Sequence, residues 1–131
     1  MNTQKKLILI AEDDQDCMDL LKFHVENFGF ETITACSQKK CEEIIETTKP
    51  DLAIFDLMME NDDSGFILSY KIKKKYPDVP VILATAVSSA TGYIFEPEKA
   101  TENSWIKADA FLEKNIRPDQ LHREINKLLK L

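Results

Sequence analysis

An α/β fold, in which a five-stranded parallel sheet carries helices on both faces, is predicted for this chain by two observations. Short apolar runs alternate with amphipathic stretches along the sequence. The apolar runs have the length of strands, and the stretches between them show apolar residues at helical spacing. Repeated βα units form parallel sheets with right-handed crossovers, so the sheet is doubly wound. The length of 131 residues suits one globular domain, which we expect to cover residues 1–131.

Five segments are predicted to be strands. Residues 7–11, 52–55 and 79–84 are almost continuously apolar, as is typical of strands buried on both faces of a sheet. Residues 32–35 are more polar, and residues 110–112 form the shortest predicted strand. The long connection between the last two strands has no clear helical period, so no helix is assigned to it.

Four segments have the apolar spacing of helices, namely 16–28, 37–48, 66–76 and a last helix that begins at Pro118. Asp14 and Ser37 are candidate N-caps of the first two helices, and Gly29 is a stop signal for the first. Each helix has an apolar stripe that is expected to face the core. The stripes are Cys17, Leu20, Leu21, Val25 and Phe28 on the first helix, Cys41, Ile44 and Ile45 on the second, Phe66, Ile67, Tyr70 and Ile72 on the third, and Leu121, Ile125, Leu128 and Leu129 on the last.

Composition and charge exclude several classes of partner. The formal net charge is −6, which argues against binding to nucleic acid or to an anionic membrane. No apolar run approaches the roughly 20 residues needed to span a bilayer, and a secretory leader is not evident, so we expect a cytoplasmic protein. The three cysteines form no CxxC pair, and Cys17 and Cys36 are expected to be buried thiols.

Polar residues follow four of the predicted strands. Glu12, Asp13 and Asp14 follow the first strand, and Asp56 follows the third. Thr85 follows the fourth strand, and Lys114 lies just past the fifth. Ligands of doubly wound sheets bind at the carboxyl ends of the strands, where these side chains meet. Neighbouring carboxylates repel each other unless a cation neutralises them, and their hard oxygens suit Mg²⁺. A carboxylate beside Mg²⁺ and lysine is equipped to accept a phosphoryl group.

The segments LILIAEDD, LAIFDLMM, VILATA and AFLEK, in this order and spacing, resemble the response-regulator receiver family over essentially the whole chain. The resemblance implies a flavodoxin-like sheet with strand order 2-1-3-4-5. It also implies a role for each matching residue: Asp56 as phosphoacceptor, Glu12, Asp13, Asp56 and the backbone carbonyl of Met58 around Mg²⁺, Thr85 and Lys114 at the phosphoryl oxygens, and Thr85 with Phe111 as the switch pair.

The same resemblance implies a signalling role in a two-component phosphorelay. Phosphorylation of Asp56 would come from a sensor histidine kinase or a phosphotransfer protein and would switch docking to a downstream protein. The domain would catalyse its own phosphorylation and slow dephosphorylation, without being an enzyme for another substrate. Because the last helix reaches the end of the sequence, we expect a stand-alone receiver whose docking face includes residues 87–108 and that helix.

The chain departs from the family pattern at three places. Glu60 and Asn115 stand where the family usually has proline, and the loop after Asp56 is one residue longer. The interval between Thr85 and Lys114 is also longer than usual. Since a cis bond before a non-proline residue costs about 3 kcal/mol, the bond before Asn115 is either trans or strained.

Three other classes of protein are alternatives to this interpretation. A phosphatase of the haloacid-dehalogenase type needs a second aspartate at the position of Met58. A dinucleotide or P-loop site needs a glycine-rich motif, and the three glycines of the chain form none. The remaining alternative is a receiver-like interaction module that works without phosphorylation.

Overall fold

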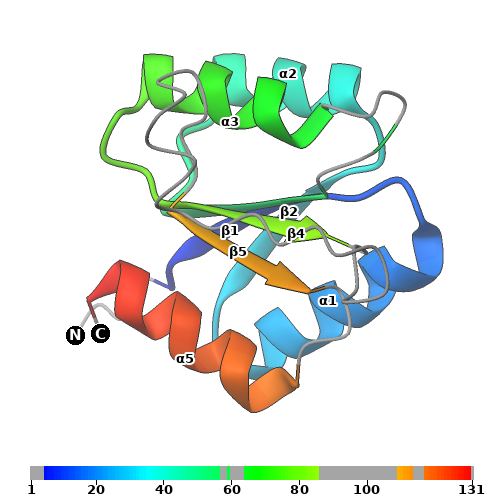
Figure 1. Ribbon diagram of the computed structural model, residues 1–131, viewed down its shortest axis with the longest axis vertical. Coiled ribbons are helices and arrows are strands. Elements are labelled where there is room, and N and C mark those ends of the chain that lie inside the picture. The colour runs from blue at the N-terminus through cyan, green and yellow to red at the C-terminus, as the bar shows by residue number, and fades with distance from the viewer. Residues whose placement is uncertain (1–4, 57–58, 60–63, 86–108, 114–116, 131) are drawn as a thin grey trace, which may run out of the picture.

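The architecture is seen in a computed structural model (Figure 1). Backbone and side chains are described for residues 5–56, 59, 64–84, 109–112 and 117–130, and the backbone alone for residues 85 and 113. The expected docking segment 87–108 therefore lies outside the described residues, as do Met58, Glu60, Lys114 and Asn115.

The sheet has the predicted form. Its strands are β1 (Leu7–Ala11), β2 (Glu31–Ala35), β3 (Leu52–Asp56), β4 (Val81–Thr85) and β5 (Ala110–Glu113). They are all parallel and pair in the order β2-β1-β3-β4-β5. This arrangement confirms the doubly wound fold and the strand order 2-1-3-4-5.

The helices lie in two layers, one on each face of the sheet (Figure 1). They are α1 (Gln15–Asn27), α2 (Gln38–Thr47), α3 (Ser64–Lys75) and α5 (Pro118–Leu129). Helices α2 and α3 cover one face, and α1 and α5 cover the other. Among the described residues, no helix is both long enough and apolar enough to cross a membrane.

The predicted start and stop signals act as expected. The Oδ1 atom of Asp14 accepts a hydrogen bond from the backbone N–H of Cys17 at 3.1 Å and caps α1. The Ser37 hydroxyl oxygen accepts one from the N–H of Lys40 at 3.1 Å and caps α2. Gly29 follows α1 with φ +100°, a conformation that side chains disfavour, and Pro118 opens α5.

Each face of the sheet has its own apolar layer, because successive strand residues point to opposite faces. In β1, Ile8 and Ile10 pack on the side of α1 and α5, whereas Leu9 and Ala11 pack on the side of α2 and α3. Strand β3 is buried along its whole length, which explains its continuous apolar sequence. The carboxyl ends of β1 and β3 are therefore fixed side by side.

The expected core stripes of two helices are partly wrong. Leu20 is 57% exposed, because α1 turns Met18 and Val25 toward the sheet instead. Tyr70 of α3 is 42% exposed, because Leu68 and Ile72 occupy the side that faces the core. Apolar spacing alone did not resolve which of two adjoining stripes is buried.

The prediction that Cys17 and Cys36 are buried thiols is also wrong, whereas the inward-facing position predicted for Cys41 is confirmed. Cys36 is exposed and Cys17 is half-buried, while Cys41 of α2 is fully buried in the core. Burial, with a smaller effect from Glu42, raises the pKa of the Cys41 thiol from 9.0 to about 12. The thiol therefore stays protonated in the folded protein at pH values where it would ionise in the unfolded chain.

We predict that Cys41 makes stability fall in alkaline solution. Below pH 9.0 the thiol is protonated in both states, so its contribution is complete; above it only the unfolded chain loses the proton. The free energy of unfolding should then fall by up to about 1.4 kcal/mol per pH unit until the folded thiol titrates. Urea unfolding of Cys41→Ala from about pH 8 to about pH 10.5 should give a flatter profile than wild type. Cys36→Ala is the control and should keep the wild-type slope; equal slopes for all three proteins would contradict the prediction.

Candidate functional site

Glu12 is held by one hydrogen bond from its backbone and another to its side chain. Its backbone N–H donates to the carbonyl oxygen of Ala35 at 3.0 Å, which continues the contact between β1 and β2 past the end of β1. Its Oε1 atom accepts a hydrogen bond from the N–H of Asp14 at 3.1 Å. The side chain is only 1% exposed, so its carboxylate occupies a defined place at the edge of the sheet.

Asp56 is the last residue of β3 and lies in the middle of the sheet. It pairs with Ala84 of β4, and its side chain is 3% exposed. Alternation along β3 puts the Asp56 side chain on the same face as Ile54, and alternation along β1 puts Glu12 on the face of Ile10.

Glu12, Asp13 and Asp56 form one acidic cluster, in which one carboxylate oxygen from each lies within 4.8 Å of the others. Glu12 and Asp56 are buried, and Asp13 is exposed, so the cluster opens to solvent at Asp13. Like charges at this spacing and depth repel each other strongly. The set consists of hard carboxylate oxygens, which fits Mg²⁺, and Mg²⁺ usually keeps several positions for water or phosphate. These three residues would hold the ion.

The other predicted site residues are described to different extents. The backbone of Thr85 ends β4, one residue beyond the partner of Asp56, and is opposite Glu113. Lys114 follows β5 directly but lies outside the described residues, as does Met58. The structure thus brings Glu12, Asp13 and Asp56 together, and the end of β4 lies near them. The roles of Thr85, Lys114 and Met58 stay predictions.

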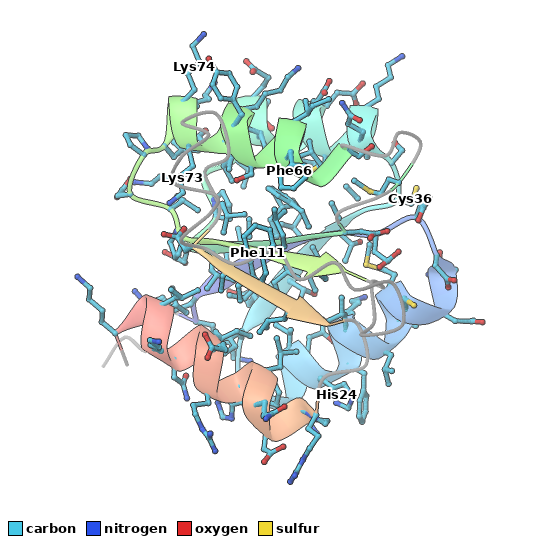
Figure 2. The ribbon with its side chains drawn as sticks, in the orientation of Figure 1. His24, Cys36, Phe66, Lys73, Lys74 and Phe111 are labelled. Atoms are coloured by element: carbon cyan, nitrogen blue, oxygen red, sulfur yellow. The ribbon has the colours of Figure 1, made fainter. Side chains whose placement is uncertain are left out.

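Phe111, the predicted switch aromatic, is half-buried on the face of the sheet that α2 and α3 cover. Its ring meets that of Phe66 edge to face, with centroids 6.4 Å apart and planes at 63°. Figure 2 shows Phe66 pointing from α3 toward the sheet, above Phe111. The sequence predicted both residues but not their contact, because nothing in a sequence states which face of α3 meets which strand.

The start of α3 is tied to α2 by side-chain hydrogen bonds that sequence reasoning missed. The buried hydroxyl of Ser64 donates to Gln38 Oε1 at 2.8 Å, and Gln38 Nε2 donates to Glu42 Oε2 at 3.0 Å. The bond from Gln38, with help from Lys71 and against the opposing effect of burial, holds the pKa of Glu42 below its ordinary value. Helix α3 therefore begins from an anchored residue eight positions after Asp56.

Comparison with known proteins gives a consistent family match. A sequence profile of the family described as "Response regulator receiver domain" matches residues 8–126. Among solved structures, a CheY-like response regulator receiver domain protein from Methanospirillum hungatei JF-1 has a TM-score of 0.81 and 26% identity, with 97% of this chain and 95% of that chain covered.

Two relatives are larger proteins. The "Probable transcriptional regulator ycf27" of Cyanophora paradoxa is 27% identical over 130 residues, which are 99% of this chain and 51% of that protein. The "Alkaline phosphatase synthesis transcriptional regulatory protein PhoP" of Bacillus subtilis (strain 168) is 24% identical over 125 residues, 95% of this chain and 49% of that protein. The chain thus spans about half the length of these relatives.

We predict that Asp13→Ala weakens Mg²⁺ binding strongly and, without metal, leaves the domain as stable as wild type or more stable. The first effect follows from loss of a ligand, and the second from relief of repulsion in the acidic cluster. Thermal unfolding with and without Mg²⁺ measures both effects. Asp16→Asn, which changes an exposed acid of α1 outside the cluster, should keep the full stabilisation by Mg²⁺. Equal Mg²⁺ affinity in wild type and Asp13→Ala would show that Asp13 is not a ligand.

Proposed function

Because the chain belongs to the response regulator receiver family, we propose that it is a phosphoacceptor domain of a two-component phosphorelay, in which Mg²⁺-dependent phosphorylation of Asp56 switches docking to a protein partner. The observation that carries the proposal is the acidic cluster. A buried Asp56 lies at the end of the central strand, within 4.8 Å of two further carboxylates at the solvent-facing edge of the sheet.

The proposed reaction is a transfer of one phosphoryl group. An oxygen of the Asp56 carboxylate attacks the phosphorus of the donor, a P–O bond to Asp56 forms, and the bond from phosphorus to the donor breaks with its electron pair leaving on the donor. Bound Mg²⁺ would supply positive charge for the phosphoryl oxygens. Glu12 and Asp13 would hold that ion, and the Lys114 ammonium and Thr85 hydroxyl would bind the transferred group.

The proposed donor is a phosphohistidine of a sensor kinase or phosphotransfer protein. Helix α1 supports a protein donor, because it begins two residues after Asp13 and exposes two large apolar side chains, Leu20 and Phe23, at 57% and 60%. They are three residues apart and share one side of the helix. Such an exposed apolar pair, on the helix that follows Asp13, suits contact with a protein that delivers the phosphoryl group.

The downstream partner is proposed to be a protein, and the domain itself is proposed to contact neither nucleic acid nor membrane. The formal net charge of −6 supports this proposal, because both surfaces are negatively charged. The named relatives are transcriptional regulators of about twice this length. We propose the cytoplasm as the place of action, where a histidine kinase domain and its phosphodonor would meet the chain.

The proposed phosphorylation of Asp56 is tested by measuring the mass of the intact chain. Incubation with acetyl phosphate and Mg²⁺ should add one phosphoryl group to the intact chain, and Asp56→Asn should abolish the addition, because a carboxamide is a poor nucleophile. Asp78→Asn alters an exposed acid that pairs with Lys49, outside the acidic cluster, and should be labelled like wild type. Labelling of the Asp56→Asn protein at the wild-type level would refute Asp56 as the acceptor. Absence of labelling in wild type would favour a module that works without phosphorylation.

A further inference from the structure

Helix α3 contacts Phe111 of strand β5 and also Asp109, the residue before the strand. Phe66 and Lys73 are seven residues apart on α3, which is close to two full turns, so they share one side of the helix. Asp109 immediately precedes β5, and Phe111 is the second residue of the strand, so alternation along the chain directs both side chains to the same side. Phe66 contacts Phe111, and Lys73 Nζ lies 2.7 Å from Asp109 Oδ2.

Lys73 differs from the neighbouring lysines in where it points. Figure 2 shows Lys73 directed from α3 toward the sheet, whereas Lys74 points away from it. The Lys73 side chain is 16% exposed and that of Asp109 35%, compared with 53% and 74% in the Lys49–Asp78 pair. Exposed pairs contribute little, while loss of one partner from a more buried pair leaves a poorly hydrated charge. Lys73 is less exposed to water than the lysines of the Lys49–Asp78, Lys71–Glu42 and Lys75–Glu46 pairs.

Asp109 also fixes the start of β5 against β4. Its backbone N–H donates to the carbonyl oxygen of Val81 at 2.8 Å, and its Oδ2 atom accepts from the N–H of Val81 at 2.7 Å. One carboxylate thus joins three elements, because the same oxygen that binds Lys73 of α3 also binds the first residue of β4.

On its other side, α3 is joined to α2 rather than to the strands. Lys71 pairs with Glu42 at 3.2 Å, and Lys75 pairs with Glu46 at 3.4 Å. In both pairs the lysine is more exposed than Lys73. Helix α3 begins at Ser64, eight residues after Asp56, and contacts Phe111 of β5 through Phe66, while β4 pairs with both β3 and β5.

We propose that Lys73 is a positioning residue, which through Asp109 joins β5 to α3 so that the Phe111 ring responds to the state of Asp56. The inference rests on the proposed function and adds to it a route through α3. A change in the chain after Asp56 shifts α3. When α3 is linked to β5 through both Phe66 and Lys73, β5 moves together with the helix. When it is linked through Phe66 alone, β5 keeps its position as the helix moves. The Lys73–Asp109 pair thus sets the fraction of molecules in which the Phe111 ring changes from one packing to the other.

The test observes Phe111 directly in the full chain labelled with fluorophenylalanine. The chain has seven phenylalanines, and a Phe111→Leu variant assigns the Phe111 fluorine resonance. Beryllofluoride with Mg²⁺ serves as the phosphoryl analogue. Wild type should shift its Phe111 resonance on binding. Lys73→Met should bind beryllofluoride with an affinity within about threefold of wild type, because the acidic cluster is untouched, but show less than about half of the resonance change.

Two variants control for charge and for general effects on stability. Lys73→Arg keeps the positive charge and should restore the wild-type response, and Lys49→Met, which breaks the exposed Lys49–Asp78 pair, should leave it unchanged. If Lys73→Met does not fold, Asp109→Asn replaces it, because the carboxamide oxygen still accepts from Val81 while the charge is lost; the same reduced response is expected.

Each outcome has one meaning. A full Phe111 response in Lys73→Met, or in Asp109→Asn where that variant is needed, overturns the inference and leaves the proposed function standing. Loss of beryllofluoride binding in Lys73→Met also overturns it, since the residue would then act on the acidic cluster. A wild-type chain that does not bind beryllofluoride overturns the proposed function, and the inference with it.

Discussion

Electrostatic repulsion among three carboxylates is the constraint on which the arrangement of this domain depends. Glu12, Asp13 and Asp56 have oxygens within 4.8 Å of one another, and two of these side chains are almost completely buried. Such a cluster is unfavourable by itself. It persists because the strands that carry it are held by two apolar layers, one on each face of the sheet. Burial of apolar surface elsewhere in the domain therefore maintains a set of carboxylate oxygens that suits a cation such as Mg²⁺.

The parallel sheet brings carboxylates that are far apart in the sequence together in the acidic cluster. Parallel strands all end at the same edge, so a carboxylate after β1 and another at the end of β3 become neighbours without any signal for their contact in the sequence. This is why the fold class, the strand order implied by the family resemblance and the acidic cluster could be predicted. Helix caps at Asp14 and Ser37 were predictable for a similar reason, because a cap depends on residues within one turn.

The failures share a different physical cause. Leu20 and Tyr70 were assigned to the core because apolar spacing defines a stripe only to within about one residue's rotation, and packing against the sheet decides the rest. The exposure of Cys36, which was expected to be buried, likewise depends on how the chain between β2 and α2 packs. The contacts of Phe66 with Phe111 and of Lys73 with Asp109 join residues 45 and 36 positions apart. Such pairs are set by tertiary packing, so a single sequence does not reveal them.

The position of β1 in the sheet has a consequence for how the chain assembles during synthesis. Strand β1, which is synthesised before the other four strands of the sheet, lies between β2 and β3, so its pairing is completed only when residues 52–56 have been made. A strand with this many distant partners delays closure of the core, since ordering a long stretch of chain precedes the contacts that stabilise it. For the same reason Glu12 and Asp13 remain far from Asp56 in the nascent chain. The mutually repelling charges therefore meet only after most of the apolar sheet is available to hold them together.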